Sequence, residues 1–233
     1  MKLAGSAALL LFCALASAQE VNLTVHARVM LDEHRQSSNA SNVVVWLNPI
    51  GSQAQQIPQS RPLILAQHHK RFEPHVLVVP VGAVVQFPNR DPFFHNVFSL
   101  FEGKRFDLGL YEAGTTRNVS FDRTGISYIF CNIHAEMSAV VVALDTPYFG
   151  VSNQKGEIVI PRVPVGRYIM HTWSETATPE ALNALAREIT VTETSSAIGT
   201  LSIPFGGATT AHKNKYGMDY EPPEPAGPAY SHP

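Results

Sequence analysis

The feature that most limits how this chain can fold is a series of short apolar runs separated by turn residues. Val, Ile and Phe dominate these runs, and apolar and polar positions alternate along residues 21–29. Such residues fit a pleated sheet, and a period of two turns one face of a strand toward a core. The 17 prolines and 15 glycines of the chain supply turns between the runs. We therefore expect an all-β chain that forms β-sandwiches.

The first 18 residues have the features of a secretory signal peptide. Residues 3–15 are almost wholly apolar, and Ala16-Ser17-Ala18 offers small residues for cleavage. Cleavage there removes Cys13 and leaves Cys131 as the one cysteine of the mature chain. In an oxidising compartment this thiol has no disulfide partner within its own chain. It is then either a buried, unreactive side chain or a metal ligand.

Charge and hydropathy argue against two classes of partner, and the motifs argue against catalysis. The formal net charge is −2 and the chain has no basic block, so we do not expect it to bind nucleic acid. After the signal peptide, no apolar run approaches the roughly 18 residues of a membrane span. No nucleophile-elbow motif and no paired catalytic carboxylates stand out, so we expect no substrate turnover.

Residues 131–137 carry the chemistry that points to a function. Their sequence is Cys131-Asn-Ile-His134-Ala-Glu-Met137, in a loop between two expected strands at 126–130 and 139–144. His95 arrives from a third strand and completes a set of one thiolate, two imidazoles and one thioether. Copper that cycles between Cu(I) and Cu(II) suits two imidazoles and a thiolate in one plane, with a weak axial methionine. These residues predict a mononuclear copper site for electron transfer.

Two segments resemble the cupredoxin family of type 1 blue copper proteins, of the amicyanin and plastocyanin kind. They are residues 87–97, which contain Phe-Pro-Asn and then Phe-Phe-His-Asn-Val, and residues 125–137. The resemblance implies a Greek-key β-sandwich and one type 1 copper per chain. It gives His95, Cys131 and His134 the equatorial positions and Met137 the axial one. It also implies that the Asn96 backbone amide donates to the cysteine sulfur.

The same resemblance implies a docking surface, a redox partner and a cellular location. Family members expose an edge of the second histidine, here His134, within an apolar patch to which Ile133 and Ala135 could belong, with Phe93 and Phe94 as weaker candidates. The implied partner is a redox protein such as a c-type cytochrome or a periplasmic dehydrogenase, and the implied location is periplasmic or secreted. The whole chain resembles secreted cupredoxin-domain proteins of the methylamine-utilisation type. This label refers to the genes found nearby and not to an activity.

One position departs from the family pattern. Amicyanin and plastocyanin have proline before the second histidine, whereas Ile133 stands there in this chain. Ile133 has a backbone N–H that proline lacks, and this N–H can point at the thiolate. A further hydrogen bond to sulfur favours the reduced state, so we expect a higher reduction potential than with proline.

A second domain follows the copper loop. Residues 151–168 resemble the hairpin of carboxypeptidase regulatory-like, transthyretin-like sandwiches, and Thr178-Pro179-Glu180 predicts a short helix start. Residues 21–47 resemble the first two strands of such a sandwich, so the copper domain is either inserted into it or placed in tandem with it. The expected organisation is a signal peptide at 1–18, first strands of the regulatory-like sandwich or an N-terminal extension at 19–61, the cupredoxin domain at 62–145, the regulatory-like β-sandwich at 146–204 and a Pro/Gly-rich tail at 205–233.

Several features leave alternatives open. His68-His69 is either a weak surface copper site or part of a solvated loop. The tail is either free or pinned to a surface by its tyrosines, Tyr216, Tyr220 and Tyr230. Besides electron transfer, the copper ligands are compatible with copper storage or delivery, and the second domain with a non-redox binding or scaffold sandwich.

Overall fold

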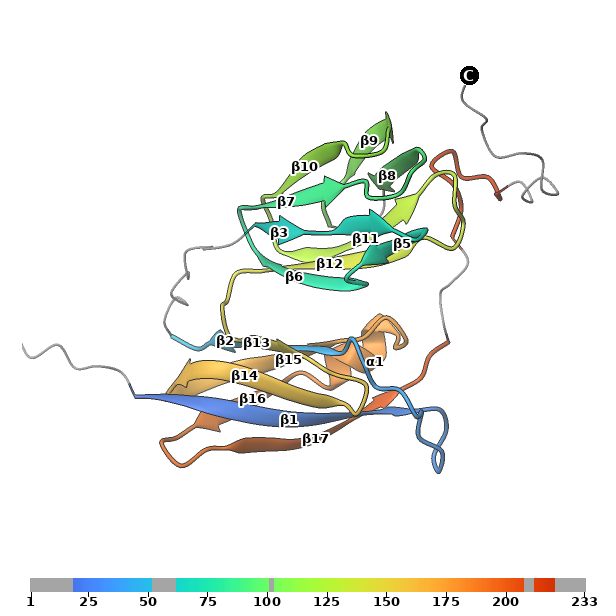
Figure 1. Ribbon diagram of the computed structural model, residues 1–233. Coiled ribbons are helices and arrows are strands. Elements are labelled where there is room, and N and C mark those ends of the chain that lie inside the picture. The colour runs from blue at the N-terminus through green and yellow to red at the C-terminus, as the bar shows by residue number, and fades with distance from the viewer. Residues whose placement is uncertain (1–18, 52–61, 101–102, 208–211, 221–233) are drawn as a thin grey trace, which may run out of the picture.

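The chain forms two β-sandwiches stacked one above the other in a computed structural model that describes residues 19–51, 62–100, 103–207 and 212–220 (Figure 1). Among these residues the regular elements are strands, apart from one short helix. The expectation of an all-β fold of sandwich type is therefore confirmed. The expected signal peptide at 1–18 and the last ten residues of the expected segment 19–61 lie outside the described residues.

The lower sandwich in Figure 1 is built from strands within residues 20–49 and 149–204. One sheet has the order β14-β1-β17 and the other β13-β2-β15-β16. Alternation in β1 places Leu23, Val25, Ala27 and Val29 in the core between the sheets. The strands are β1 (Glu20–Met30), β2 (Val44–Pro49), β13 (Phe149–Val151), β14 (Glu157–Pro164), β15 (Gly166–Trp173), β16 (Arg187–Val191) and β17 (Ala197–Pro204).

Strand pairing decides how the two sandwiches are connected in the structure. β1 pairs antiparallel with β14, with Val25 opposite Ile158, and β2 pairs antiparallel with β15. The lower sandwich thus contains strands from before residue 50 and after residue 148, while residues 63–144 form the upper one. This is the pairing that an inserted domain requires and a tandem arrangement does not.

The upper sandwich carries the predicted metal loop. Its larger sheet has the order β6-β12-β11-β8-β9, and the facing sheet has the order β10-β7-β3. The strands are β3 (Leu63–Ile64), β6 (Val76–Pro80), β7 (Ala83–Pro88), β8 (His95–Ser99), β9 (Phe106–Tyr111), β10 (Thr116–Phe121), β11 (Gly125–Cys131) and β12 (Ser138–Leu144). Between β3 and β6 lies a hairpin of β4 (Ala66–His68) and β5 (Arg71–Glu73).

An apolar layer joins the two sandwiches. In β12, Val141 faces the core of the upper sandwich, while Val140 and Val142 face the opposite way, toward Val44 and Trp173 of the lower one. Strand β12 is therefore buried on both faces, which explains its almost unbroken apolar sequence.

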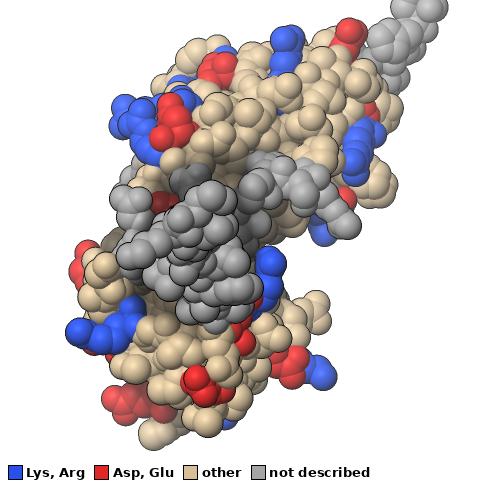
Figure 2. Space-filling view, turned by 90° about the vertical axis from the view of Figure 1, so that its left-hand side faces the viewer, with Lys and Arg blue, Asp and Glu red and all other residues tan. Residues whose placement is uncertain are grey.

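Charged side chains of both signs are scattered over the upper and lower parts of the face in Figure 2.

The short helix follows the predicted start signal. Helix α1 (Pro179–Ala184) is preceded by Thr178, whose hydroxyl accepts a hydrogen bond from the Ala181 backbone N–H. Proline at the first helical position lacks only an N–H that would have no partner within the helix. No helix in the described ranges is long and apolar enough to cross a membrane.

The structure differs from the expected elements at two places. His68 ends strand β4 and His69 begins the turn of the β4–β5 hairpin, so only the second of the two lies in a loop; the paired Gln67 and Phe72 turn one face of these two very short strands inward. Strand β9 was also not expected from the sequence. It is an edge strand that pairs with β8 alone, and few of its side chains are fully buried, so residues 106–111 lack a clear apolar alternation.

A histidine–carboxylate pair connects the two sandwiches and predicts a pH dependence. Nε2 of His75 lies 2.7 Å from Oε2 of Glu175, and Nδ1 lies 3.1 Å from the Ser138 carbonyl oxygen. The hydrogen bond to Glu175 raises the pKa of His75 above 6.5 despite burial. Because the folded protein holds this proton more tightly, the stabilisation is complete below pH 6.5 and is lost as pH rises through the raised pKa.

We expect Glu175→Gln to flatten this pH dependence of the free energy of unfolding. The expected effect is about 1 kcal/mol or less, because the pair is partly exposed and solvent screens it. Urea unfolding of both proteins at a series of pH values between 5 and 9 measures it. An identical pH profile in the variant contradicts the assignment to His75.

Candidate metal centre

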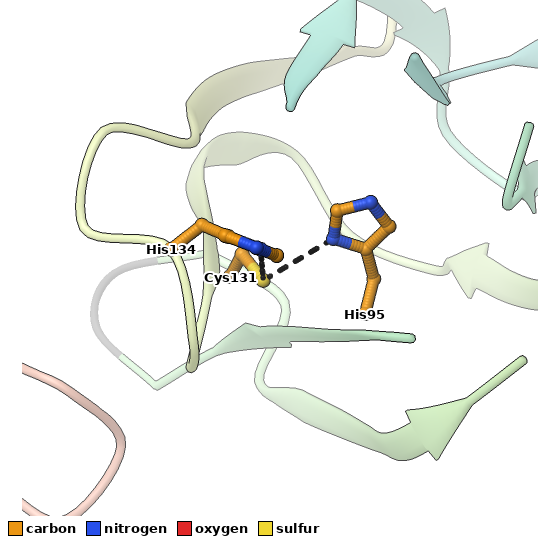
Figure 3. Close-up of side chains that lie close together, drawn as sticks. All are labelled: His95, Cys131 and His134. Atoms are coloured by element: carbon orange, nitrogen blue, oxygen red, sulfur yellow. Dashed lines mark hydrogen bonds between the residues drawn. The ribbon is translucent and has the colours of Figure 1, made fainter. Parts of the chain in front are cut away.

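Strand register brings His95 and Cys131 to the same face of one sheet. Cys131, the last residue of β11, lies opposite Val97 of β8. His95 lies two residues before Val97, so its side chain points to the same side as those of Val97 and Cys131. Both side chains are fully buried. His134 follows in the loop after β11, and Figure 3 shows the Cys131 sulfur between the two imidazole rings.

The distances among these three side chains fit a metal ion. The Cys131 Sγ atom lies 3.6 Å from Nδ1 of His95 and 3.5 Å from Nδ1 of His134. A metal about 2.3 Å from sulfur and about 2.0 Å from nitrogen, with angles between tetrahedral and trigonal, separates the sulfur from each nitrogen by about 3.5–3.7 Å. The donor set and its spacing therefore suit a soft transition metal, which the thiolate favours.

Asp91 orients the first of these rings. Its Oδ2 atom lies 2.9 Å from Nε2 of His95, and both side chains are almost completely buried. Burial disfavours the charged carboxylate, but hydrogen bonds from the Lys70 N–H, the His95 ring and the His69 N–H hold the pKa of Asp91 below its usual value. An ionised carboxylate can only accept, so Nε2 carries the proton and Nδ1 presents its lone pair toward the sulfur.

The protonation states of the two histidines also suit a metal ligand. Burial lowers the pKa of His95, and this effect outweighs the attraction of Asp91. Burial and the neighbouring His95 likewise lower the pKa of His134. Both imidazoles are therefore neutral at neutral pH, and neutral imidazole is the form that binds a metal.

Backbone amides surround the cysteine sulfur. Burial raises the pKa of the Cys131 thiol, while hydrogen bonds from the N–H groups of Asn96, Ile133 and His134 act in the opposite direction. The contact from Asn96 is the one that the family resemblance implies, and the contact from Ile133 is the additional one expected where proline is absent. A bound cation would reinforce these donors and favour the thiolate.

The loop that carries His134 is closed by backbone hydrogen bonds. Met137 N–H donates to the His134 carbonyl at 3.1 Å, and Cys131 N–H donates to the Met137 carbonyl at 3.2 Å. The Met137 side chain is fully buried in the same apolar cluster as Cys131.

Aromatic and apolar side chains border the open side of the centre. The Phe93 ring lies 5.2 Å from the His95 ring and 5.6 Å from the His134 ring, between centroids, so it packs over both. His134 is half-buried, while Ile133 is 47% exposed and Phe94 45%. Phe93 is thus packed against both imidazole rings, and Phe94 and Ile133 face solvent.

The tail returns to the metal loop. Tyr220 donates its hydroxyl to the Cys131 carbonyl at 2.7 Å, and the Lys215 N–H donates to the Asn132 side chain at 2.9 Å. The His212 ring stacks on Phe130, with 3.9 Å between centroids. Of the three tail tyrosines, Tyr220 is held in this way, Tyr216 is largely exposed, and Tyr230 lies outside the described residues.

Sequence reasoning missed Asp91 and the tail contacts of His212 and Lys215. Asp91 lies four residues before His95, but this spacing on an irregular segment sets no fixed distance between side chains. Only the buried position of Asp91, next to the β4–β5 turn, brings its carboxylate to Nε2.

The chain matches no protein-family model and no curated protein. Part of it is similar to solved copper protein structures. A copper-containing nitrite reductase from Thermus scotoductus has 22% identity and a TM-score of 0.35, over 42% of this chain and 25% of its own. A purple cupredoxin from Nitrosopumilus maritimus has 23% identity and a TM-score of 0.31, over 35% and 96%. A Cu(I) amicyanin variant has 17% identity and a TM-score of 0.34, over 43% and 98%.

Proposed function

We propose that this protein is an electron carrier with one type 1 copper ion held by His95, Cys131 and His134, and by Met137 as a weak axial ligand. The observation that carries the proposal is the pair of sulfur–nitrogen separations, 3.5 Å and 3.6 Å, in a buried group of two imidazoles and one thiol. Two imidazoles, a thiolate and a distant thioether form the donor set of blue-copper electron-transfer sites.

Copper supplies a one-electron couple at this place, and the protein keeps its ligands still. Cys131 and His95 stand on adjacent paired strands, and Asp91 fixes the ring of His95. The hydrogen bonds that close the loop hold His134 relative to Cys131. Because rigid elements prevent the ligands from rearranging when the oxidation state changes, each transfer costs little reorganisation.

His134 is the ligand nearest to a docking surface in this proposal. Ile133, Phe94 and Ala135 are exposed beside it and give an apolar contact area. The expected partner is a redox protein such as a c-type cytochrome or a periplasmic dehydrogenase, in the periplasm or outside the cell. In this role the protein transfers electrons and does not turn over a substrate.

Copper loading of the purified full chain tests the proposal. An intense visible absorption band from the copper–thiolate bond, together with reversible voltammetry, is expected for an electron carrier. A copper storage or delivery protein would instead lose its metal quickly to a chelator. A copper-loaded protein without the intense band, or with no reversible couple, would contradict electron transfer.

The backbone N–H of Ile133 allows us to predict in which direction the reduction potential changes when proline replaces this residue. Its N–H donates to the Cys131 sulfur, which becomes more negative when copper is reduced. Replacing Ile133 with proline removes this donor, so the reduced state loses stabilisation and the potential falls. Redox titration of Ile133→Pro measures the shift, with Ile133→Ala as a control that keeps the N–H. An unchanged or higher potential in the proline variant contradicts the role of this hydrogen bond.

A further inference from the structure

A second group of metal-binding side chains lies on the β4–β5 hairpin. It consists of His68, His69 and Glu73, whose ligand atoms all lie within 4.8 Å of one another. Nδ1 of His68 is 3.4 Å from Oε2 of Glu73, and the two imidazole rings are 3.7 Å apart between centroids. We propose that these three side chains form a second metal site, for a divalent first-row transition metal ion.

The hairpin register explains why these side chains meet. Gln67 pairs with Phe72, and both point inward, with 0% and 3% exposure. The flanking positions, His68 and Glu73, therefore point to the opposite, outer face. His69 comes next, at the start of the turn, with a left-handed φ of 53°.

The buried Asp91 carboxylate holds the turn in place, in addition to the pairing of the two hairpin strands. His69 and Lys70 both have positive φ values, 53° and 54°, which are unfavourable for residues other than glycine. Their N–H groups donate to the two oxygens of the Asp91 carboxylate, at 2.6 Å and 3.0 Å. This anchor fixes the backbone from which the His69 ring projects. The same carboxylate binds His95, so the hairpin turn and the first centre share one buried residue.

The donor set of the hairpin differs from that of the first centre. It offers two nitrogens and one oxygen, and no sulfur. Imidazole and carboxylate bind Zn²⁺, Ni²⁺ and Cu²⁺, with Cu²⁺ the strongest of the divalent ions. The side chains are half-buried or exposed, so water can complete the coordination and the ion can exchange. Arg71, the cross-strand partner of His68, is a charge on the same face that weakens the site.

Nickel binding to the untagged full chain tests the site independently of the proposed function. The test uses Cys131→Ser, which removes the thiolate of the first centre and leaves the hairpin intact. Calorimetry is expected to show one Ni²⁺ bound per chain in this variant. Adding His68→Gln is expected to weaken that binding at least tenfold, whereas adding His34→Ala, at an exposed histidine elsewhere, leaves it unchanged.

Two further measurements sharpen the outcome. Arg71→Gln removes the opposing charge and should tighten Ni²⁺ binding. In the wild-type chain, a second equivalent of Cu²⁺ should give a tetragonal paramagnetic resonance signal without adding to any intense visible band, because no thiolate is involved. If His68→Gln and Glu73→Gln both bind Ni²⁺ as the parent does, with unchanged circular dichroism, the hairpin site does not exist.

Discussion

Replacement of Cys131 with serine is expected to abolish the intense visible absorption of the copper-loaded protein. The Cys131 Sγ atom lies 3.6 Å from Nδ1 of His95 and 3.5 Å from Nδ1 of His134. A serine hydroxyl is a hard, weakly acidic donor that cannot replace a thiolate in this chemistry. Copper affinity should fall by more than about 100-fold, because residues that merely support the ligands of a metal site already contribute 10–100-fold.

Absorption spectra and copper stoichiometry after dialysis measure this result. Met137→Leu provides a matched comparison within the same loop, since it leaves the thiolate and both imidazoles in place. We expect this variant to keep the intense band and to change its reduction potential, as an axial ligand tunes the potential. A serine variant that retains both colour and copper would show that the metal lies elsewhere.

The sequence could predict which side chains come together at the candidate site because ligand chemistry restricts the residue types strongly. A cysteine, a histidine and a methionine at intervals of three left one imidazole to be found, and His95 was the histidine between expected strands. The structure brings His95, Cys131 and His134 together. Asp91 could not be found in this way, because a carboxylate that supports a ligand follows no spacing rule.

The sequence left open whether the copper domain is inserted into the other sandwich or placed in tandem with it, for a similar reason. Alternation in residues 21–29 predicts that β1 has one buried face, but it does not say which strand lies beside it. The choice depends on long-range pairing, here Val25 with Ile158, across more than a hundred residues. The tail contacts of Tyr220 and Lys215 are long-range in the same sense, since their partners are Cys131 and Asn132.

The second large effect is expected at the layer between the sandwiches. Trp173 of β15 is 5% exposed and packs with the outward side chains of β12, Val140 and Val142. Trp173→Ala removes a large buried side chain, and such changes cost about 3–5 kcal/mol. The control is Val159→Ala on β14, where the side chain is 56% exposed and the expected cost is below about 1 kcal/mol.

Urea unfolding followed by two signals tests whether this layer couples the sandwiches. Circular dichroism reports on all strands, whereas the copper absorption reports on the upper sandwich alone. Because strand β12 is buried on one face by the upper core and on the other by Trp173 and Val44, we expect both transitions to move together to lower urea in Trp173→Ala. If the copper signal keeps its wild-type midpoint while circular dichroism shifts, the sandwiches unfold separately. The group of His95, Cys131 and His134 would then draw no stability from the lower sandwich.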